Sequence, residues 1–432
     1  MSSVLESLAA FVQDPELALQ AEIRMDRLRL HIADTLGMIL QGASLAEGKT
    51  ALALGSRLAG WCASARLTEA DDIHLTSCTT PGSVVVPTAL HLAAAGLFQT
   101  WGDFVTAALA GYETLIRIGY AIDGPRILAR KIWPTLFAAP VGAAAVASRA
   151  CGLNGSQTVG ALATAFAAST GIAPPALTSN SSRCISLGFA AEHGVRAPMA
   201  ARAGALGDVQ LIERHAGRIA GMRISRRRLL QGAGLQFFFD EIELKPYPIA
   251  RQGLAAVEAC RQLAGRNTKG ITAITVSVPS AQARVIDHPS WPANRMQSIA
   301  SIQYQIALAL LAPDRLMDFA RTPPFVTPTL RSLAAKVRVR TDARLETRYP
   351  DTWPAHVVVE RSGRRQAALV SIPRGDARNP IEWEDVLAKA AGYRTALTWI
   401  RKALRKPRFR NFLTLCHRRG RDACGGSPPL MA

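Results

Sequence analysis

The amino-acid sequence predicts a mainly α-helical protein with a smaller α+β part. Apolar residues recur at helical spacing from the N-terminus to about residue 264, and they alternate as in strands at several places over residues 270–372. Helical spacing returns over residues 381–401. We therefore expect an all-helical domain over residues 1–267, an α+β domain over 268–385, and a helix over 386–401 that packs back on the first domain.

The first part contains a series of helical patterns. Residues 27–40 place apolar side chains on one face of a helix, and Gly42 follows as a stop signal. The same periodicity predicts further helices over residues 87–95, 101–120, 140–149 and 157–170. Many positions on these segments hold Ala, Gly or Ser instead of Leu. Small side chains let helix axes approach closely, so we expect a densely packed domain.

The pattern changes near residue 270. Residues 272–279 alternate between apolar and polar side chains, and residues 336–340 do the same. Two further strand patterns flank Ser362-Gly363, which predicts a hairpin over residues 356–372. Helical patterns over residues 299–311 and 328–335 lie between these strands. Together they predict a sheet with helices packed against it.

The composition is that of a globular protein with a basic end. The 432 residues are 49% hydrophobic and 19% charged, which excludes wholesale disorder and allows two or three domains. Lys and Arg number 51 against 32 Asp and Glu, and residues 402–432 hold eight of these basic residues with a single Asp. We expect this segment to be a disordered tail that contacts nucleic acid nonspecifically at most.

Cysteine usage and hydropathy indicate a cytoplasmic protein. The seven cysteines are scattered, with no Cys-x-x-Cys pair and no His at ligand spacing, which argues against a disulfide framework or a zinc site. The N-terminal residues carry acids where a signal peptide would carry Lys or Arg. We see no apolar run of the roughly 18–20 residues needed to cross a membrane.

Six segments of the sequence, taken in order, resemble the MmgE/PrpD family, whose members include 2-methylcitrate dehydratase, cis-aconitate decarboxylase and iminodisuccinate epimerase. The matching segments are Ala-Asp-Asp-Ile-His (70–74), Pro-Gly-Ser-Val (81–84) with its helix, Gly-Tyr-Glu (111–113) with Arg-Ile-Gly (117–119), Trp-Pro-Thr (133–135), Lys-Pro-Tyr-Pro (245–248) and Ser-Ile-Gln-Tyr (301–304). The basic tail differs from a family C-terminus, so a frameshifted or fused end is an alternative origin for it.

This resemblance implies a fold and a type of site. It implies a helical domain made from both chain ends, an α+β lid domain between them, and a homodimer. It also implies an active site between the domains that binds small di- or tricarboxylates. The resemblance implies no obligatory metal and no organic cofactor, and we expect no membrane partner.

The sequence departs from the family pattern at positions that the resemblance assigns to the active site. Thr80 stands where the family has His before Pro-Gly, and Trp133 stands where it has His before Pro-Thr. The family segment Lys-Arg-Leu-His begins with Arg183 here and ends with Ser186. Four functional positions remain in register, namely Asp72, His74, Lys245 and Tyr304.

The retained residues are the catalytic candidates. Abstracting a proton next to a carboxylate needs a base and an acid that titrate near neutral pH. Lys245 is the preferred base because a partly desolvated ammonium loses its proton more easily. Tyr304 could act as an acid or orient a carboxylate, although a Tyr of the lid core is the alternative. Asp72 and His74 could act as a pair only in an extended or looped stretch.

The replaced residues are the candidates for substrate binding. Arg183 could hold a carboxylate through two hydrogen bonds but could not act as a base. Thr80 and Ser186 could donate hydrogen bonds to a substrate. Trp133 puts a larger apolar ring where the family has an imidazole, so we expect it to reshape the pocket.

These features favour a lyase that acts on a small di- or tricarboxylate, by dehydration or decarboxylation. An epimerase or isomerase of an amino- or hydroxy-dicarboxylate is the first alternative, because it needs only a base and an acid on opposite faces of the substrate. The second alternative is a catalytically impaired homodimer that serves a structural or ligand-binding role, which the three replaced imidazoles favour.

Overall fold

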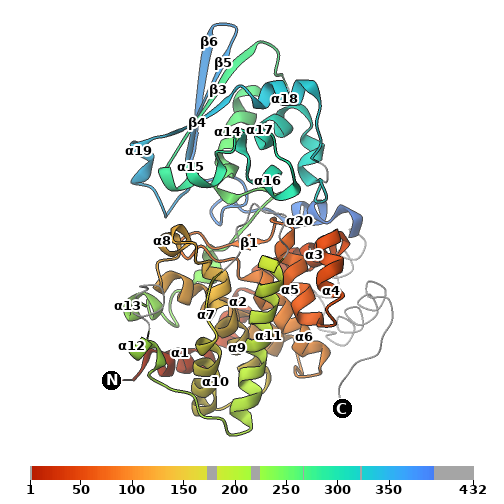
Figure 1. Ribbon diagram of the computed structural model, residues 1–432. Helices are drawn as coiled ribbons and strands as arrows, with labels where there is room; N and C mark the ends of the chain where they lie inside the picture. Colours follow the sequence, from red (N-terminus) through yellow and green to blue (C-terminus); the bar gives the residue numbers. More distant parts are fainter. Residues whose placement is uncertain (1, 173–181, 216–223, 266, 322–323, 394–432) are drawn as a thin grey trace.

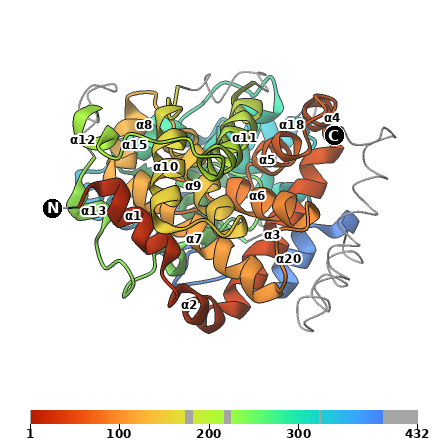
Figure 2. The ribbon, with the colours of Figure 1, turned by 90° about the horizontal axis from the view of Figure 1, so that it is seen from below.

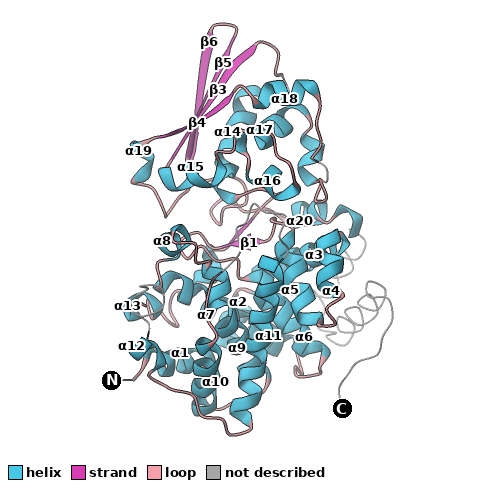
Figure 3. Cartoon of the chain, in the orientation of Figure 1, coloured by secondary structure: helices cyan, strands magenta, loops and turns pink. Residues whose placement is uncertain are grey.

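A computed structural model of the protein describes residues 2–172, 182–215, 224–265, 267–321 and 324–393. It shows a larger helical part and a smaller part that contains a four-stranded sheet (Figures 1 and 3). The predicted fold class, mainly α with an α+β part, is confirmed. The expected tail over residues 402–432 lies outside the described residues.

The helical domain consists mainly of helices that share one large hydrophobic core. Its helices are α1 (Val4–Gln13), α2 (Leu17–Ile23), α3 (Met25–Ser44), α4 (Ala46–Leu52), α5 (Arg57–Leu67), α6 (Gly82–Ala94), α7 (Trp101–Ala121), α8 (Gly124–Ala129), α9 (Pro134–Ala150), α10 (Gly155–Ala167), α11 (Ser182–Arg202), α12 (Leu211–His215) and α13 (Arg226–Leu229). A 3₁₀ turn, η1 (Phe238–Glu241), follows them.

Small residues let these helices pack closely. Gly188 of α11 lies so near α5 that an added Cβ would stand 2.5 Å from the backbone of Ala59. No side chain fits in that space, so the position requires glycine. The helices α6 and α9 begin five and six residues before the segments expected from the sequence. The expected segments began at Pro87 and Pro140, but both prolines lie inside the helices.

The lid domain has a mixed sheet with the strand order β4-β3-β5-β6. The strands are β3 (Ile271–Val278), β4 (Val337–Thr341), β5 (Ala355–Arg361) and β6 (Arg364–Val370). Strands β3 and β4 are parallel, and the other two pairs are antiparallel. The expected hairpin joins β5 to β6 through Ser362 and Gly363, whose positive φ angles of 48° and 78° are typical of a tight hairpin turn.

Helices cover one face of this sheet and enclose a second hydrophobic core (Figure 3). The helices of the lid domain are α14 (Leu254–Ala264), α15 (Ser280–Ile286), α16 (Arg295–Ala300), α17 (Ile302–Leu311), α18 (Pro328–Ala334) and α19 (Ala343–Glu346), with the 3₁₀ turns η2 (Arg251–Gly253) and η3 (Pro313–Met317). Of these helices, α14, α15, α17 and α18 contribute residues to the second core. The helix expected over residues 299–311 is divided at Ser301, whose side chain caps α17 by accepting from the Tyr304 amide.

The structure corrects the domain boundary expected at residue 267. Helix α14 packs on β5, β6 and α17, and its buried residues belong to the core of the lid domain. The chain therefore enters the lid domain just after β2 (Glu243–Leu244), before α14 begins. The sequence assigned α14 to the first domain because its apolar spacing continues the preceding helical pattern, and spacing does not tell which core a helix joins.

The chain returns to the helical domain after β6. Helix α20 (Trp383–Lys389) packs on α3, and Figure 2 shows the two helices side by side. Ile381 and Val386 share a small hydrophobic cluster with Ala33 of α3. A short 3₁₀ turn, η4 (Ala391–Tyr393), is the last described element, so most of the helix expected over 386–401 lies outside the described residues. Within the described residues, no helix is both long and apolar enough to span a membrane.

Candidate active site

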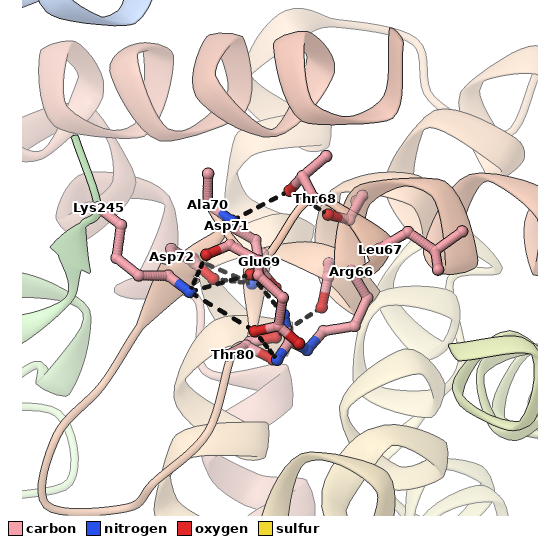
Figure 4. Close-up of polar contacts among 12 residues, drawn as sticks. Arg66, Leu67, Thr68, Glu69, Ala70, Asp71, Asp72, Thr80 and Lys245 are labelled. Atoms are coloured by element: carbon pink, nitrogen blue, oxygen red, sulfur yellow. Dashed lines mark hydrogen bonds and ion pairs between the residues drawn. The ribbon is translucent and has the colours of Figure 1, made fainter. Parts of the chain in front are cut away.

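A two-stranded ribbon brings the candidate residues together at the junction of the two domains. Strand β1 (Asp72–Ile73) pairs antiparallel with β2, so that Asp72 lies opposite Leu244. This pairing sets Lys245, the residue after β2, beside the loop that follows α5. Figure 4 shows the Lys245 side chain reaching toward residues 66–72.

Lys245 is buried among carboxylates. Its Nζ donates to the carbonyl oxygen of Glu69 at 2.5 Å and lies 3.6 Å from Asp71 Oδ1. The side chain is only 3% exposed. Burial lowers the pKa of Lys245 below its ordinary value, although the nearby Asp71 and Glu69 oppose the change. The amine is therefore easier to deprotonate than that of a solvated lysine.

Two arginines complete the charged group around Glu69. Arg66, in the last turn of α5, pairs with Glu69 Oε2 at 2.6 Å and with Asp71 Oδ1 at 2.8 Å. Arg183, in the first turn of α11, lies 3.2 Å from Glu69 Oε1. Burial alone would raise the pKa of Glu69, but Arg66, Arg183 and Lys245 together hold it at about 2. Glu69 is therefore ionised at neutral pH.

Trp133 lies against these arginines. It precedes α9 and is 5% exposed, and its ring centroid is 4.2 Å from the Arg183 guanidinium carbon and 5.5 Å from that of Arg66. A cation over an aromatic face is attracted by the ring quadrupole. The indole at this family imidazole position thus supports the guanidinium groups.

Lys389, which was not predicted as a site residue, contacts both the loop before β1 and the backbone of Lys245. It is fully buried in α20, and its Nζ contacts Asp34 Oδ1 of α3 at 2.6 Å. The same ammonium donates to the carbonyl oxygens of Ala70 at 2.7 Å and of Lys245 at 2.8 Å. Through this ion pair and these two hydrogen bonds, Lys389 connects the loop, the Lys245 backbone and α3.

Asp72 and His74 make separate contacts. The Asp72 carboxylate accepts from the Gly82 amide, with oxygen distances of 2.9 and 3.0 Å, and so satisfies the N-terminus of α6. Burial, together with nearby Asp71, raises the pKa of Asp72 well above its ordinary value. His74 instead places Nδ1 2.9 Å from Ser77 Oγ and Nε2 3.4 Å from Glu241 Oε2. Asp72 and His74 thus position the loop that carries them.

The two hydroxyl candidates, Thr80 and Ser186, lie in different segments of the helical domain. Thr80 is 5% exposed, its amide donates to Thr135 Oγ1 at 3.0 Å, and the two hydroxyl oxygens are 3.3 Å apart. Ser186 is half-buried on α11, about one turn after Arg183. Thr80 thus connects the start of α6 to α9, whereas Ser186 shares a helix with the carboxylate-binding candidate.

Tyr304 lies apart from the group around Lys245. It is 1% exposed within the core of the lid domain, and its ring packs edge-on against Trp291 with centroids 5.3 Å apart. The hydroxyl donates to the carbonyl oxygen of Phe325 at 3.1 Å. In this arrangement the side chain supports the lid domain, which was the alternative to a catalytic role.

Four residues of the charged group, Arg66, Glu69, Asp71 and Lys389, were not among the site residues predicted from the sequence, although the first three could have been found there. Arg66, Glu69 and Asp71 lie within six residues before Asp72, so their charges are close in the sequence to a residue of the family motif. Lys389 lacks such a signal, because it follows an ordinary helical pattern. Among the described residues, no group of three or more His, Cys, Asp or Glu side chains is arranged to hold a metal ion.

Comparisons with known proteins identify the family of this chain. Residues 61–227 match the model of the MmgE/PrpD N-terminal domain, and residues 247–398 match that of the MmgE/PrpD C-terminal domain. The gap between the two matches contains β2 and Lys245, where the chain passes from the helical domain to the lid domain. No curated protein matches the chain. The two matches cover most of the chain in the expected order, and the protein therefore belongs to the MmgE/PrpD family.

Proposed function

We propose that this protein is a lyase that removes a proton next to a carboxylate of a small di- or tricarboxylate, by dehydration or decarboxylation. Family membership supports an enzyme of the dehydratase-related kind. The observation that carries the proposal is the place of Lys245, a buried lysine of lowered pKa at the junction of the two domains. A base of this kind suits proton abstraction near neutral pH.

The proposed mechanism assigns separate tasks to the charged residues. For a dehydration, Lys245 Nζ accepts the proton from the carbon next to the substrate carboxylate, the electrons of that C–H bond form the C=C bond, and the β-hydroxyl leaves as water with the proton returned by the Lys245 ammonium. For a decarboxylation, CO₂ leaves and the Lys245 ammonium protonates the carbon that carried it. Arg183 and Arg66 hold the substrate carboxylate and stabilise the negative charge that develops on it when the proton leaves. Asp71, 3.6 Å from Lys245 Nζ, stabilises the ammonium that forms. In this scheme Lys389 positions the backbone of Lys245 by donating a hydrogen bond to its carbonyl oxygen.

Deuterium exchange tests the base. The purified protein is incubated in deuterated water with a panel of hydroxy-dicarboxylates and hydroxy-tricarboxylates, and the products are followed by NMR. We expect Lys245→Met to reduce turnover at least a hundredfold. Lys336→Met is the matched control, since Lys336 Nζ donates to the Ile271 carbonyl within the lid domain. Normal turnover in folded Lys245→Met would remove Lys245 from the mechanism.

The same experiment separates the alternatives. Exchange without net turnover would indicate an epimerase or isomerase, which needs proton removal and return only. A second candidate, a catalytically impaired homodimer that binds a ligand, is favoured by one observation. Lys245 and Arg183 are both engaged with Glu69, while Tyr304 is bonded inside the lid domain. Absence of exchange with every acid of the panel would support that candidate.

A further inference from the structure

Glu69 places its own carboxylate where three cations converge. Arg66 and Arg183 contact its two oxygens at 2.6 and 3.2 Å, and Lys245 Nζ lies 4.0 Å from Oε2. The side chain is 10% exposed. A carboxylate of the protein itself thus has the surroundings expected for a bound carboxylate ligand.

The backbone of Glu69 is unusual for a glutamate. Its φ is +54°, and it directly follows Thr68, the residue that caps the end of α5. At this place a helix commonly ends on a residue in the left-handed conformation, and glycine is preferred because it has no Cβ. The chain carries a long charged side chain at a position that favours glycine. Such strained residues concentrate at functional sites.

The charged group also keeps unused hydrogen-bonding capacity. Arg66 Nε and Asp71 Oδ2 are buried, and neither has a hydrogen-bond partner among the described residues. The two side chains are 6% and 1% exposed. A buried polar atom without a partner is costly, so the contacts within the protein leave this group incompletely satisfied.

We propose that Glu69 is an internal carboxylate that occupies the subsite for one substrate carboxylate, so that a small dicarboxylate binds by displacing it. This inference rests on the proposed function for the class of ligand. With Lys245 protonated, three cations face Glu69 and Asp71, which leaves one net positive charge. When the Glu69 side chain moves away, the subsite carries two net positive charges, which match a dicarboxylate.

Calorimetric titration with succinate and with citrate tests the displacement, with inorganic phosphate as a separate arm. The variant is Glu69→Gln, which keeps the shape of the side chain but removes its charge. We expect its affinity for succinate to rise at least tenfold over the unsubstituted protein. Glu360→Gln is the matched control, because Glu360 pairs with Arg365 on the lid sheet and its loss should leave the affinity unchanged.

Glu69→Gly is the second variant. Glycine adopts the positive φ of this position without strain, and it leaves no side chain in the subsite. Glu69→Gly can therefore replace Glu69→Gln in the titration if the latter does not fold. Unchanged or weaker affinity for both acids in a variant with a native circular dichroism spectrum would overturn the inference. A gain for phosphate without a gain for either acid would overturn it as well.

The titration does not depend on turnover, so the two proposals can fail separately. Tighter binding by Glu69→Gln, with no deuterium exchange in the unsubstituted protein, would support displacement of Glu69 and reject the lyase. Turnover by the unsubstituted protein, with no change of affinity in either variant, would support the lyase and reject displacement.

Discussion

At the scale of single residues, the pKa values of Glu69 and Lys245 are both lowered, but by different causes: neighbouring charges dominate at Glu69 and burial dominates at Lys245. Arg66, Arg183 and Lys245 outweigh burial at Glu69 and lower its pKa. Burial outweighs the neighbouring carboxylates at Lys245 and lowers its pKa as well. The cluster therefore favours a charged Glu69 and a more easily deprotonated Lys245, which is the division of charge that a base beside a carboxylate subsite needs.

The ionisation of Glu69 predicts a pH dependence of stability. Its pKa is about 2 in the folded protein against an ordinary value of 4.5. Because the folded state binds this proton less tightly, the stabilisation is complete above about pH 4.5 and is lost as the pH falls toward 2. The difference corresponds to about 3 kcal/mol. We expect Glu69→Gln to lower the free energy of unfolding by about this amount at pH 7.

Urea unfolding at several pH values between 7 and 3 checks this prediction. The difference between the unsubstituted protein and Glu69→Gln should stay constant from pH 7 to about pH 4.5 and shrink below that pH. A difference that does not shrink between about pH 4.5 and pH 3 would mean that the Glu69 carboxylate is not held in its ionised form by the cations.

At the scale of elements, the short helix α20 acts on the site through one side chain. Lys389 reaches Asp34 of α3 and the backbone of the β1–β2 region at the same time. Burial raises the pKa of Asp34 although Lys389 opposes it, so a charged Asp34 depends on the ammonium. The pairing joins the returning chain end to the first half of the helical domain.

Removing Lys389 alone should therefore be costly. Lys389→Met leaves a buried carboxylate without its partner, and we expect the free energy of unfolding to fall by about 3–5 kcal/mol. The double variant Asp34→Asn/Lys389→Met removes both charges and should recover part of this loss. A double-mutant cycle by urea unfolding measures the coupling. Strictly additive costs would show that the two residues do not stabilise each other.

At the scale of the whole molecule, the lid domain is attached to the helical domain beside the candidate site. Arg295 of α16 donates to the carbonyl oxygen of Leu67 at 2.6 Å, and it lies 3.4 Å from Glu47 Oε1 of α4. Leu67 is the residue after Arg66. The hydrogen bond from Arg295 therefore connects the lid domain to the end of α5, the helix that carries Arg66.

Loss of Arg295 should loosen this attachment. We expect Arg295→Met to increase the radius of gyration measured by small-angle X-ray scattering and to reduce amide-exchange protection over residues 67–73. Arg331→Met is the control, because the Arg331 guanidinium packs over Trp291, 5.0 Å from the ring centroid, within the lid domain. Equal protection in both variants would mean that Arg295 does not hold the domains together.

The sequence by itself determined the local elements. Helical spacing predicted α3 and α7 closely, and alternation with a Ser-Gly turn predicted β3, β5 and β6. These features depend on residues a few positions apart, whose side-chain spacing is written directly in the sequence. The family motifs also indicated the region of Asp72 and Lys245, because the motif residues are contiguous in the chain.

Only the tertiary structure decided which charges meet. Lys245 and Glu69 are 176 positions apart, and Lys389 and Ala70 are 319 positions apart. Their contacts follow from the pairing of β1 with β2 and from the packing of α20 on α3. Local spacing carries no information about such distant pairs. The same reason explains why α14 was assigned to the wrong domain and why the place of Tyr304 within the lid core could be seen only in the folded chain.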